Sequence, residues 1–138
     1  MTSEIDIKNL MQTIGTQARA AYSQLAAASP AQKNAALLES AKAIRSQSER
    51  IIAANDADMS ATNNAKLSKV LLDRLKLKSE TIEAMAKSLE EIAAFPDPVG
   101  KILAEWTRPN GLKIRRVSVP LGVIGIIYES RPNVTADA

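Results

Sequence analysis

Neither cysteine nor histidine occurs among the 138 residues. Without cysteine, the chain can form no disulfide, no thiolate metal site and no cysteine nucleophile of its own. Without histidine, it can form neither a Ser-His-Asp triad nor a histidine-ligated zinc site. Aromatic residues make up only 3% of the chain, and no apolar stretch approaches the length of a membrane span. Three large classes of catalytic site are therefore excluded within these residues.

The charge is only mildly basic. Eighteen basic residues face 15 acidic ones, for a formal net charge of +3, and the two signs are interleaved along the chain. Nucleic-acid binding usually requires a basic face with aromatic or motif support, so it is poorly supported here. The first residues are acidic and lack the apolar core of a signal peptide, so secretion is not expected. Because 46% of the residues are hydrophobic and 24% charged, we expect an ordered globular protein. Without a membrane-length apolar run or a signal core, it is expected to be soluble and cytoplasmic.

Glycine divides the sequence into two parts. Gly15 is the only glycine before residue 100, whereas four glycines lie between Gly100 and Gly125. The first part is rich in alanine, leucine, lysine and glutamate, which favour helices. The last third is rich in valine and isoleucine, which favour strands. We therefore predict an α/β fold that changes from helix to strand near residue 96.

Apolar residues at three- and four-residue steps predict several helices in the first part. The first has an apolar stripe from Ile7 to Leu25 and should end before Ser29-Pro30. The next begins with Pro30 at its first helical position. A break is expected near residues 46–49, and a short helix over residues 67–75. Ser79 is predicted to cap a further helix with a clear apolar stripe.

Residues 101–119 alternate between apolar and polar side chains on either side of an Asn-Gly pair. This pair tolerates positive φ and is the strongest short signal for a hairpin turn. The alternation places Arg115 and Arg116 on opposite faces, so they do not form a basic patch. We therefore predict a β-hairpin over these residues.

Residues 123–128 (V-I-G-I-I-Y) are predicted to form a strand buried on both faces. Such strands occur mainly in parallel sheets that are covered by helices. A parallel neighbour is reached only through a crossover connection, and nothing before Gly100 resembles that neighbour. The strand is therefore expected to belong to a parallel sheet that these residues leave incomplete.

The stretch from Val119 to Thr135, V-P-L-G-V-I-G-I-I-Y-E-S-R-P-N-V-T, resembles γ-glutamyl phosphate reductase. This family, also called glutamate-5-semialdehyde dehydrogenase, is part of the aldehyde dehydrogenase superfamily. L-S-K-V-L-L-D-R-L at residues 67–75 and D-P-V-G at residues 97–100 agree with it in the expected order. The resemblance spans nearly the whole chain but only the first third of a family member. It is most specific in Y-E-S-R-P-N-V-T.

The resemblance implies an activity in proline biosynthesis. The family reduces L-glutamyl 5-phosphate to L-glutamate 5-semialdehyde and phosphate, with NADPH as the hydride donor. A cysteine thiolate forms the covalent intermediate in that chemistry. Because this chain has no cysteine, we expect it to be the inactive N-terminal portion of such an enzyme. The alternative is a non-catalytic helical interaction module.

The resemblance also implies roles for single residues. Asn133 matches a side-chain amide that stabilises the oxyanion, although the residue could equally shape a turn. Arg131 could bind the substrate, because a guanidinium pairs with carboxylate or phosphate oxygens, or it could be solvated or ion-paired. Tyr128, Glu129 and Ser130 follow the predicted strand, where ligands bind in α/β sheets, and are expected to line the cofactor cleft. No metal site is expected.

Three regions follow from the resemblance. Residues 1–100 form the helical N-terminal part of a cofactor-binding domain. Residues 101–119 form a hairpin of the type that packs against a partner subunit, so a homo-oligomer is expected. Residues 120–138 form the first nucleotide-fold strand, the first of a Rossmann-like parallel sheet that is incomplete here, and the start of the next segment.

Overall fold

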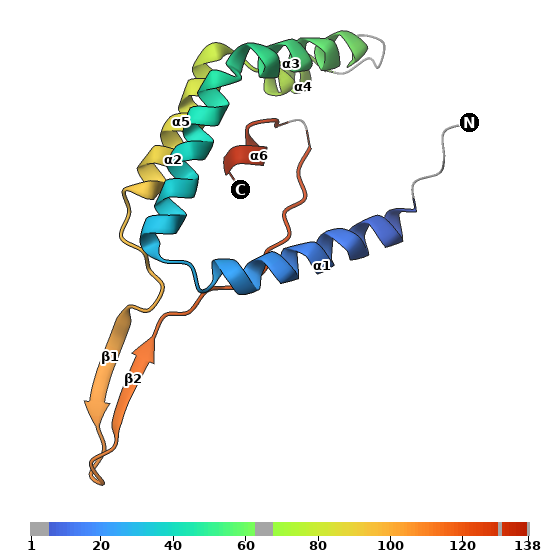
Figure 1. The fold of residues 1–138 in the computed structure, drawn as a ribbon. Coiled ribbons are helices and arrows are strands. Elements are labelled where there is room, and N and C mark those ends of the chain that lie inside the picture. The colour runs from blue at the N-terminus through green and yellow to red at the C-terminus, as the bar shows by residue number, and fades with distance from the viewer. Residues whose placement is uncertain (1–5, 63–67, 130, 138) are drawn as a thin grey trace. The chain divides into compact units, whose positions relative to one another are not determined.

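The computed structural model describes residues 6–62, 68–129 and 131–137 (Figure 1). The helices come first and the hairpin follows later, as the sequence predicts. In chain order the elements are α1 (Ile7–Leu25), α2 (Pro30–Ser46), α3 (Ser48–Thr62), α4 (Lys69–Leu75), α5 (Ser79–Ala93), β1 (Ile102–Thr107), β2 (Lys113–Val117) and α6 (Val134–Asp137). The predicted α/β class is therefore confirmed.

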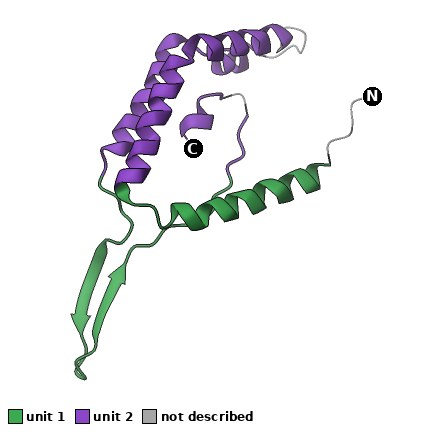
Figure 2. Cartoon of the chain, viewed as in Figure 1, with its two compact units in different colours: residues 1–30, 96–125 green, residues 31–95, 126–138 purple. Residues whose placement is uncertain are grey.

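The chain folds as two compact units (Figure 2). The first consists of residues 1–30 and 96–125, and contains α1 and the hairpin. The second consists of residues 31–95 and 126–138, and contains the remaining helices. Both units are built from two stretches that are distant in sequence.

Helix α1 of the first unit is capped by Asp6. One oxygen of the Asp6 carboxylate accepts a hydrogen bond from the backbone N–H of Asn9 at 3.1 Å, and the other accepts one from the Asn9 side chain at 2.6 Å. Such a cap satisfies N–H groups that have no partner within the helix. The apolar stripe of α1 is not covered, since Ile7, Leu10 and Ile14 are all exposed. This helix is therefore held by its own backbone and its cap rather than by a core.

Strands β1 and β2 form an antiparallel pair, which confirms the predicted hairpin. Gly111 has a φ of +83° in the connecting turn, a conformation that glycine adopts without steric cost. Glu105 lies directly opposite Arg115, and the two side chains form an ion pair across the strands. Trp106 stays 43% exposed on this ribbon. Two strands alone are marginally stable in water, so the hairpin needs cover to be stable.

The helical part of the second unit matches its prediction with one correction. Pro30 begins α2, and the break between α2 and α3 falls at Gln47, as expected. Helix α3 continues to Thr62. The predicted cap at Ser79 is wrong, because Lys78 is the N-cap residue and Ser79 is already helical. Lys78 makes no side-chain cap hydrogen bond, so α5 is positioned by packing rather than by its cap.

The core of this unit lies where α5 packs against α2. Ala41 of α2 and Ala86 of α5 are completely buried, and Leu89 of α5 is buried in the same cluster. Because alanine has a small side chain, two helices that meet at alanines can approach closely and bury their neighbours. Ile82 is the largest side chain that is fully buried among the described residues, at 1% exposure. The apolar stripe predicted for α5 is therefore the main source of burial.

A branched ion pair fastens the same two helices. Arg45 of α2 donates from Nε and Nη2 to Glu83 at 2.8 and 2.6 Å, and from Nη1 and Nη2 to Glu90. Both carboxylates belong to α5. These hydrogen bonds lower the pKa of Glu83 and of Glu90, and the two carboxylates raise the pKa of Arg45. The charges thus lie beside the apolar contact between α2 and α5.

Among the described residues of the unit, Asn55 of α3 is the buried polar one, at 4% exposure. Its side-chain amide donates to the carbonyl of Leu75 at 2.9 Å, and its carbonyl accepts from the N–H of Leu77 at 2.7 Å. A buried amide with both groups satisfied can hold a turn without the cost of an unpaired polar atom. Asn55 therefore fixes the connection between α4 and α5.

Residues 118–129 lie outside any helix or strand, which differs from the strand predicted for residues 123–128. Ile127 is fully exposed, and Leu121 nearly so. A strand forms only when its backbone groups bond to a neighbouring strand, and the sole sheet of the described residues is the two-stranded hairpin. The predicted strand therefore has no partner here. Each helix in the described ranges is too short or too polar to cross a membrane.

Candidate functional site

The predicted site residues lie on the segment that ends in α6. The carbonyl of Asn133 accepts hydrogen bonds from the N–H groups of Ala136 and Asp137 at 3.0 and 3.1 Å, and Arg131 accepts one from Val134 at 3.0 Å. Asn133 thus lies in the turn that begins α6. This position suits the local tendency of a Pro-Asn pair to start a turn.

The side chain of Asn133 is held by Asp137. Asn133 Nδ2 donates to Asp137 Oδ2 at 2.7 Å, and the two residues are four positions apart. Asn133 is half-buried, whereas Asp137 is exposed. A carboxylate only accepts hydrogen bonds, and a side-chain amide offers two N–H groups. One N–H of Asn133 therefore remains available to another acceptor.

A second hydrogen bond closes the segment on itself. Tyr128 Oη lies 2.6 Å from Thr135 Oγ1, which joins the start of the segment to α6. The hydroxyl of tyrosine and that of threonine can each donate or accept, so the pair is self-satisfying. This contact links Tyr128, a predicted cofactor-cleft residue, to the turn that carries Asn133.

No ion pair among the described residues holds the other predicted site residues. Glu129 and Arg131 are exposed, and neither forms an ion pair with another residue that the structure describes. A guanidinium in water is able to take an anionic ligand without first breaking a salt bridge. Ser130 lies outside the described residues.

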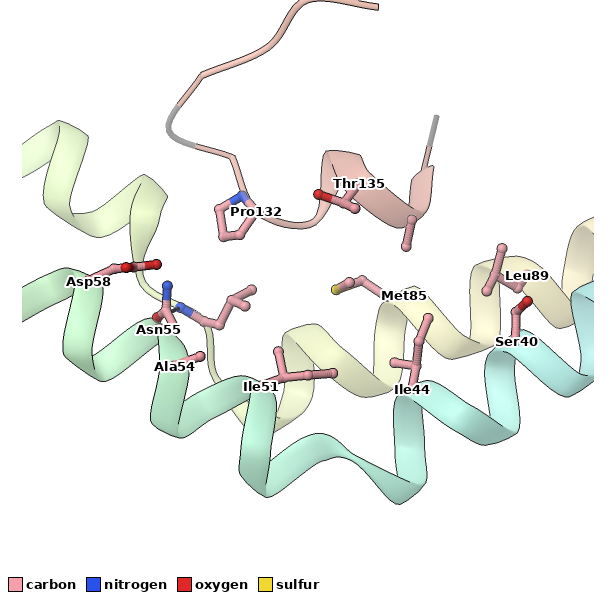
Figure 3. A pocket seen from close by; sticks show the side chains of 12 residues that line it. Ser40, Ile44, Ile51, Ala54, Asn55, Asp58, Met85, Leu89, Pro132 and Thr135 are labelled. Carbon is pink, nitrogen blue, oxygen red and sulfur yellow. Dashed lines mark hydrogen bonds between the residues drawn. The ribbon is translucent and has the colours of Figure 1, made fainter. Parts of the chain in front are cut away.

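Helix α6 rests over a cavity of about 590 Å³ in the second unit (Figure 3). Figure 3 shows Pro132 and Thr135 on one side of it and Ile44, Ile51 and Met85 on the other. Ile44 belongs to α2, Ile51 to α3 and Met85 to α5, so three helices contribute to its floor. The lining is mainly apolar, and the turn before α6 is seated on it.

Sequence reasoning did not find Thr135 and Asp137. The spacing of four between Asn133 and Asp137 was the available signal, because side chains four apart on a helix are neighbours. This signal could not be used, because the residues before 133 predict a strand. In addition, α6 has only four residues, which is too short for a helical pattern to be visible in the sequence. Thr135 is paired over seven positions with Tyr128, and no local pattern indicates such a contact.

The described residues do not by themselves form a dinucleotide site. Gly122 has a φ of +101°, but an added Cβ there or at Gly125 would meet open space, so no backbone cradles a phosphate at either position. Glycines of a phosphate-binding loop open a helix and let the backbone approach the ligand. Tyr128 and Glu129 are both exposed. In the described ranges, no group of three acidic residues is placed to hold a metal ion.

Comparison with known proteins finds relatives of a single kind. No protein-family model matches the chain. It is 56% identical over 138 residues to a gamma-glutamyl phosphate reductase of Paramagnetospirillum magneticum, and 60% identical over 133 residues to one of Rhodospirillum rubrum. These matches cover 100% and 96% of this chain but 33% and 31% of the relatives. The chain thus spans about a third of the length of the curated relatives it matches.

Solved structures agree with the sequence relatives. The crystal structure of gamma-glutamyl phosphate reductase from Thermotoga maritima matches 88% of this chain with a TM-score of 0.84 and 39% identity, over 29% of its own length. The enzyme from Saccharomyces cerevisiae matches 91% of this chain with a TM-score of 0.85 and 31% identity, over 32% of its own length. The resemblance predicted from the sequence is therefore confirmed, and it is to the N-terminal portion of these proteins.

Proposed function

We propose that this chain is the N-terminal portion of a gamma-glutamyl phosphate reductase, an oxidoreductase of proline biosynthesis. The whole enzyme would reduce L-glutamyl 5-phosphate to L-glutamate 5-semialdehyde and release phosphate, with NADPH as the reductant, in the cytoplasm. The observation that carries the proposal is the 56% identity that extends over all 138 residues. The specific Y-E-S-R-P-N-V-T stretch within that length supports it.

The chemical work would be divided between this chain and the rest of the enzyme. The covalent step requires a cysteine, and these residues contain none. We therefore expect no NADPH-dependent turnover from the 138-residue chain. Residues 1–100 would contribute helical cover to the cofactor-binding domain. Residues 123–128 form no strand in this chain, but in the whole enzyme neighbouring strands would let residues 120–138 supply the first strand of the sheet and the turn that follows.

Asn133 would stabilise the oxyanion of the reacting acyl group. A side-chain amide aimed at developing negative charge is worth about two to three powers of ten in rate. Its second N–H is the group available for this, because the first is bound by Asp137. In the full-length enzyme, Asn133→Ala should lower kcat by about 100- to 1000-fold and leave the KM for NADPH nearly unchanged. An unaltered kcat would overturn this assignment.

Arg131 would bind the substrate through its carboxylate or phosphate oxygens. Its exposed guanidinium, which forms no ion pair with another described residue, supports this role. Tyr128, Glu129 and Ser130 would line the cofactor cleft beside it. The hairpin of residues 101–119 would join partner subunits, and its exposed Trp106 is the kind of residue that anchors an interface.

A non-catalytic helical interaction module remains the second candidate, favoured by the exposed apolar stripe of α1. The DNA that follows codon 138 distinguishes between the two candidates. An open frame that encodes further α/β sequence and a cysteine supports the reductase. A stop codon at that point would overturn it and favour the interaction module.

A further inference from the structure

We infer that Asp137 is a positioning residue for Asn133, and that it sets which atom of the Asn133 amide faces the reacting acyl group. The inference rests on the proposed function, because it concerns the same oxyanion-stabilising amide. It assigns to Asp137 a part that neither the sequence pattern nor the likeness to known reductases indicates.

The first argument is chemical. The terminal torsion of asparagine is soft, so an unrestrained amide turns easily about its Cβ–Cγ bond. In one orientation the amide presents N–H to an oxyanion, and in the opposite one it presents its carbonyl oxygen, which repels negative charge. The Asp137 carboxylate can only accept, so its contact at 2.7 Å requires that Nδ2 of Asn133 face it. This contact therefore excludes the flipped orientation.

The second argument is geometric. Asn133 and Asp137 are one helical turn apart, and the carbonyl of Asn133 accepts a hydrogen bond from the N–H of Asp137 at 3.1 Å. A different set of side chains, at positions 132, 135 and 136, lines the cavity above the helices of the unit (Figure 3). Tyr128 adds its bond to Thr135 on this anchored set. The turn is thus seated by one set of side chains, to which Asn133 and Asp137 do not belong.

The contact can be tested directly in the 138-residue chain by NMR. The two side-chain amide protons of Asn133 are assigned in ¹⁵N-labelled protein from the pair of signals that Asn133→Ala removes. Asp137→Ala should shift this pair and speed its exchange with water, whereas Asp137→Asn, which keeps an acceptor oxygen, should preserve part of the effect. Asp73→Ala on α4 removes an exposed aspartate elsewhere and serves as the control. An Asn133 pair that does not change in Asp137→Ala overturns the inference.

The consequence for catalysis is tested in the full-length enzyme. Asp137→Ala should lower kcat by about tenfold, below the roughly 100-fold that misplacement of a reacting group can cost, without changing the KM for NADPH. Asp137→Asn should recover part of the rate, and Asp73→Ala should keep all of it. If Asp137 acts through Asn133, then Asp137→Ala has no further effect once Asn133 is alanine.

The outcomes separate the inference from the proposed function. A large loss in Asn133→Ala with no loss in Asp137→Ala overturns only the inference. Equal losses from Asp137→Ala in the presence and absence of Asn133 also overturn it, because Asp137 then acts by another route. An unaltered kcat in Asn133→Ala overturns the oxyanion role of Asn133, and the catalytic part of Asp137 with it.

Discussion

Helix α5 and residues 119–128 are both rich in large apolar side chains, yet they meet opposite environments. On α5, Ile82 is fully buried against the other helices of its unit, whereas Ile127 is fully exposed. A helix satisfies its own backbone and needs only one apolar face to be covered, which α2 provides. A buried strand also needs neighbouring strands for its backbone groups. Apolar content alone therefore does not decide which parts of this chain are buried.

The sharpest way to test this contrast is to remove the same atoms from both regions. Ile82→Ala should lower the free energy of unfolding by about 2–5 kcal/mol, since it deletes buried methyl and methylene groups and leaves a cavity. Urea unfolding followed by circular dichroism measures the loss. A change below about 0.5 kcal/mol, the range of surface substitutions, would show that α5 is not the core of the unit.

A weaker effect is expected from the ion pairs beside that core. The pKa values of Glu83 and Glu90 are lowered chiefly by their hydrogen bonds to Arg45, so the unfolded chain binds more protons than the folded one in acid. The stability from these pairs is present above the ordinary carboxyl pKa and is lost as the pH falls through the lowered values. Arg45→Met should remove this part of the pH dependence.

The measurement is the urea midpoint of the unmodified chain and of Arg45→Met across the acidic range. As the pH is lowered, the midpoint of the unmodified chain should fall more steeply than that of Arg45→Met. Lys42→Met is the control, because Lys42 forms an exposed pair with Glu39 on α2 alone. Parallel declines in all three proteins would contradict a role of Arg45 in joining α2 to α5.

The smallest effect on stability is expected in residues 119–128. Ile127→Ala should change the free energy of unfolding by less than about 0.5 kcal/mol, because this side chain has no burial to lose. It should instead reduce self-association, which light scattering detects, since it removes part of an exposed apolar run. A loss as large as that of Ile82→Ala would mean that residues 119–128 are covered in solution.

Much of the fold could be predicted because it depends on local patterns. The stripe of α5, the proline that begins α2 and the Asn-Gly turn each act within a few residues, and each was placed correctly. The contacts of Arg45 join residues 38 and 45 positions apart, and no sequence spacing indicates them. The strand predicted over residues 123–128 is absent from this chain for the same reason, because its formation depends on neighbours that are far away in sequence.

The candidate site was found by resemblance rather than by pattern. The Pro-Asn pair alone predicts a turn, which the structure contains, and the family likeness supplies the oxyanion role of Asn133. The hydrogen bonds of Asn133 to Asp137 and of Tyr128 to Thr135 required coordinates. Sequence reasoning thus located the segment but not the contacts that shape it.

The exposed run of residues 119–128 has a consequence for the order of events during synthesis. In the reductase that we propose, the ribosome completes α5 and the hairpin first, and their local contacts can form at once. The apolar run then leaves the exit tunnel before the strands that would cover it have been translated. During this interval it offers the kind of segment that aggregates. In that enzyme, these ten residues would be the segment most open to aggregation, until the next strands of the sheet arrive.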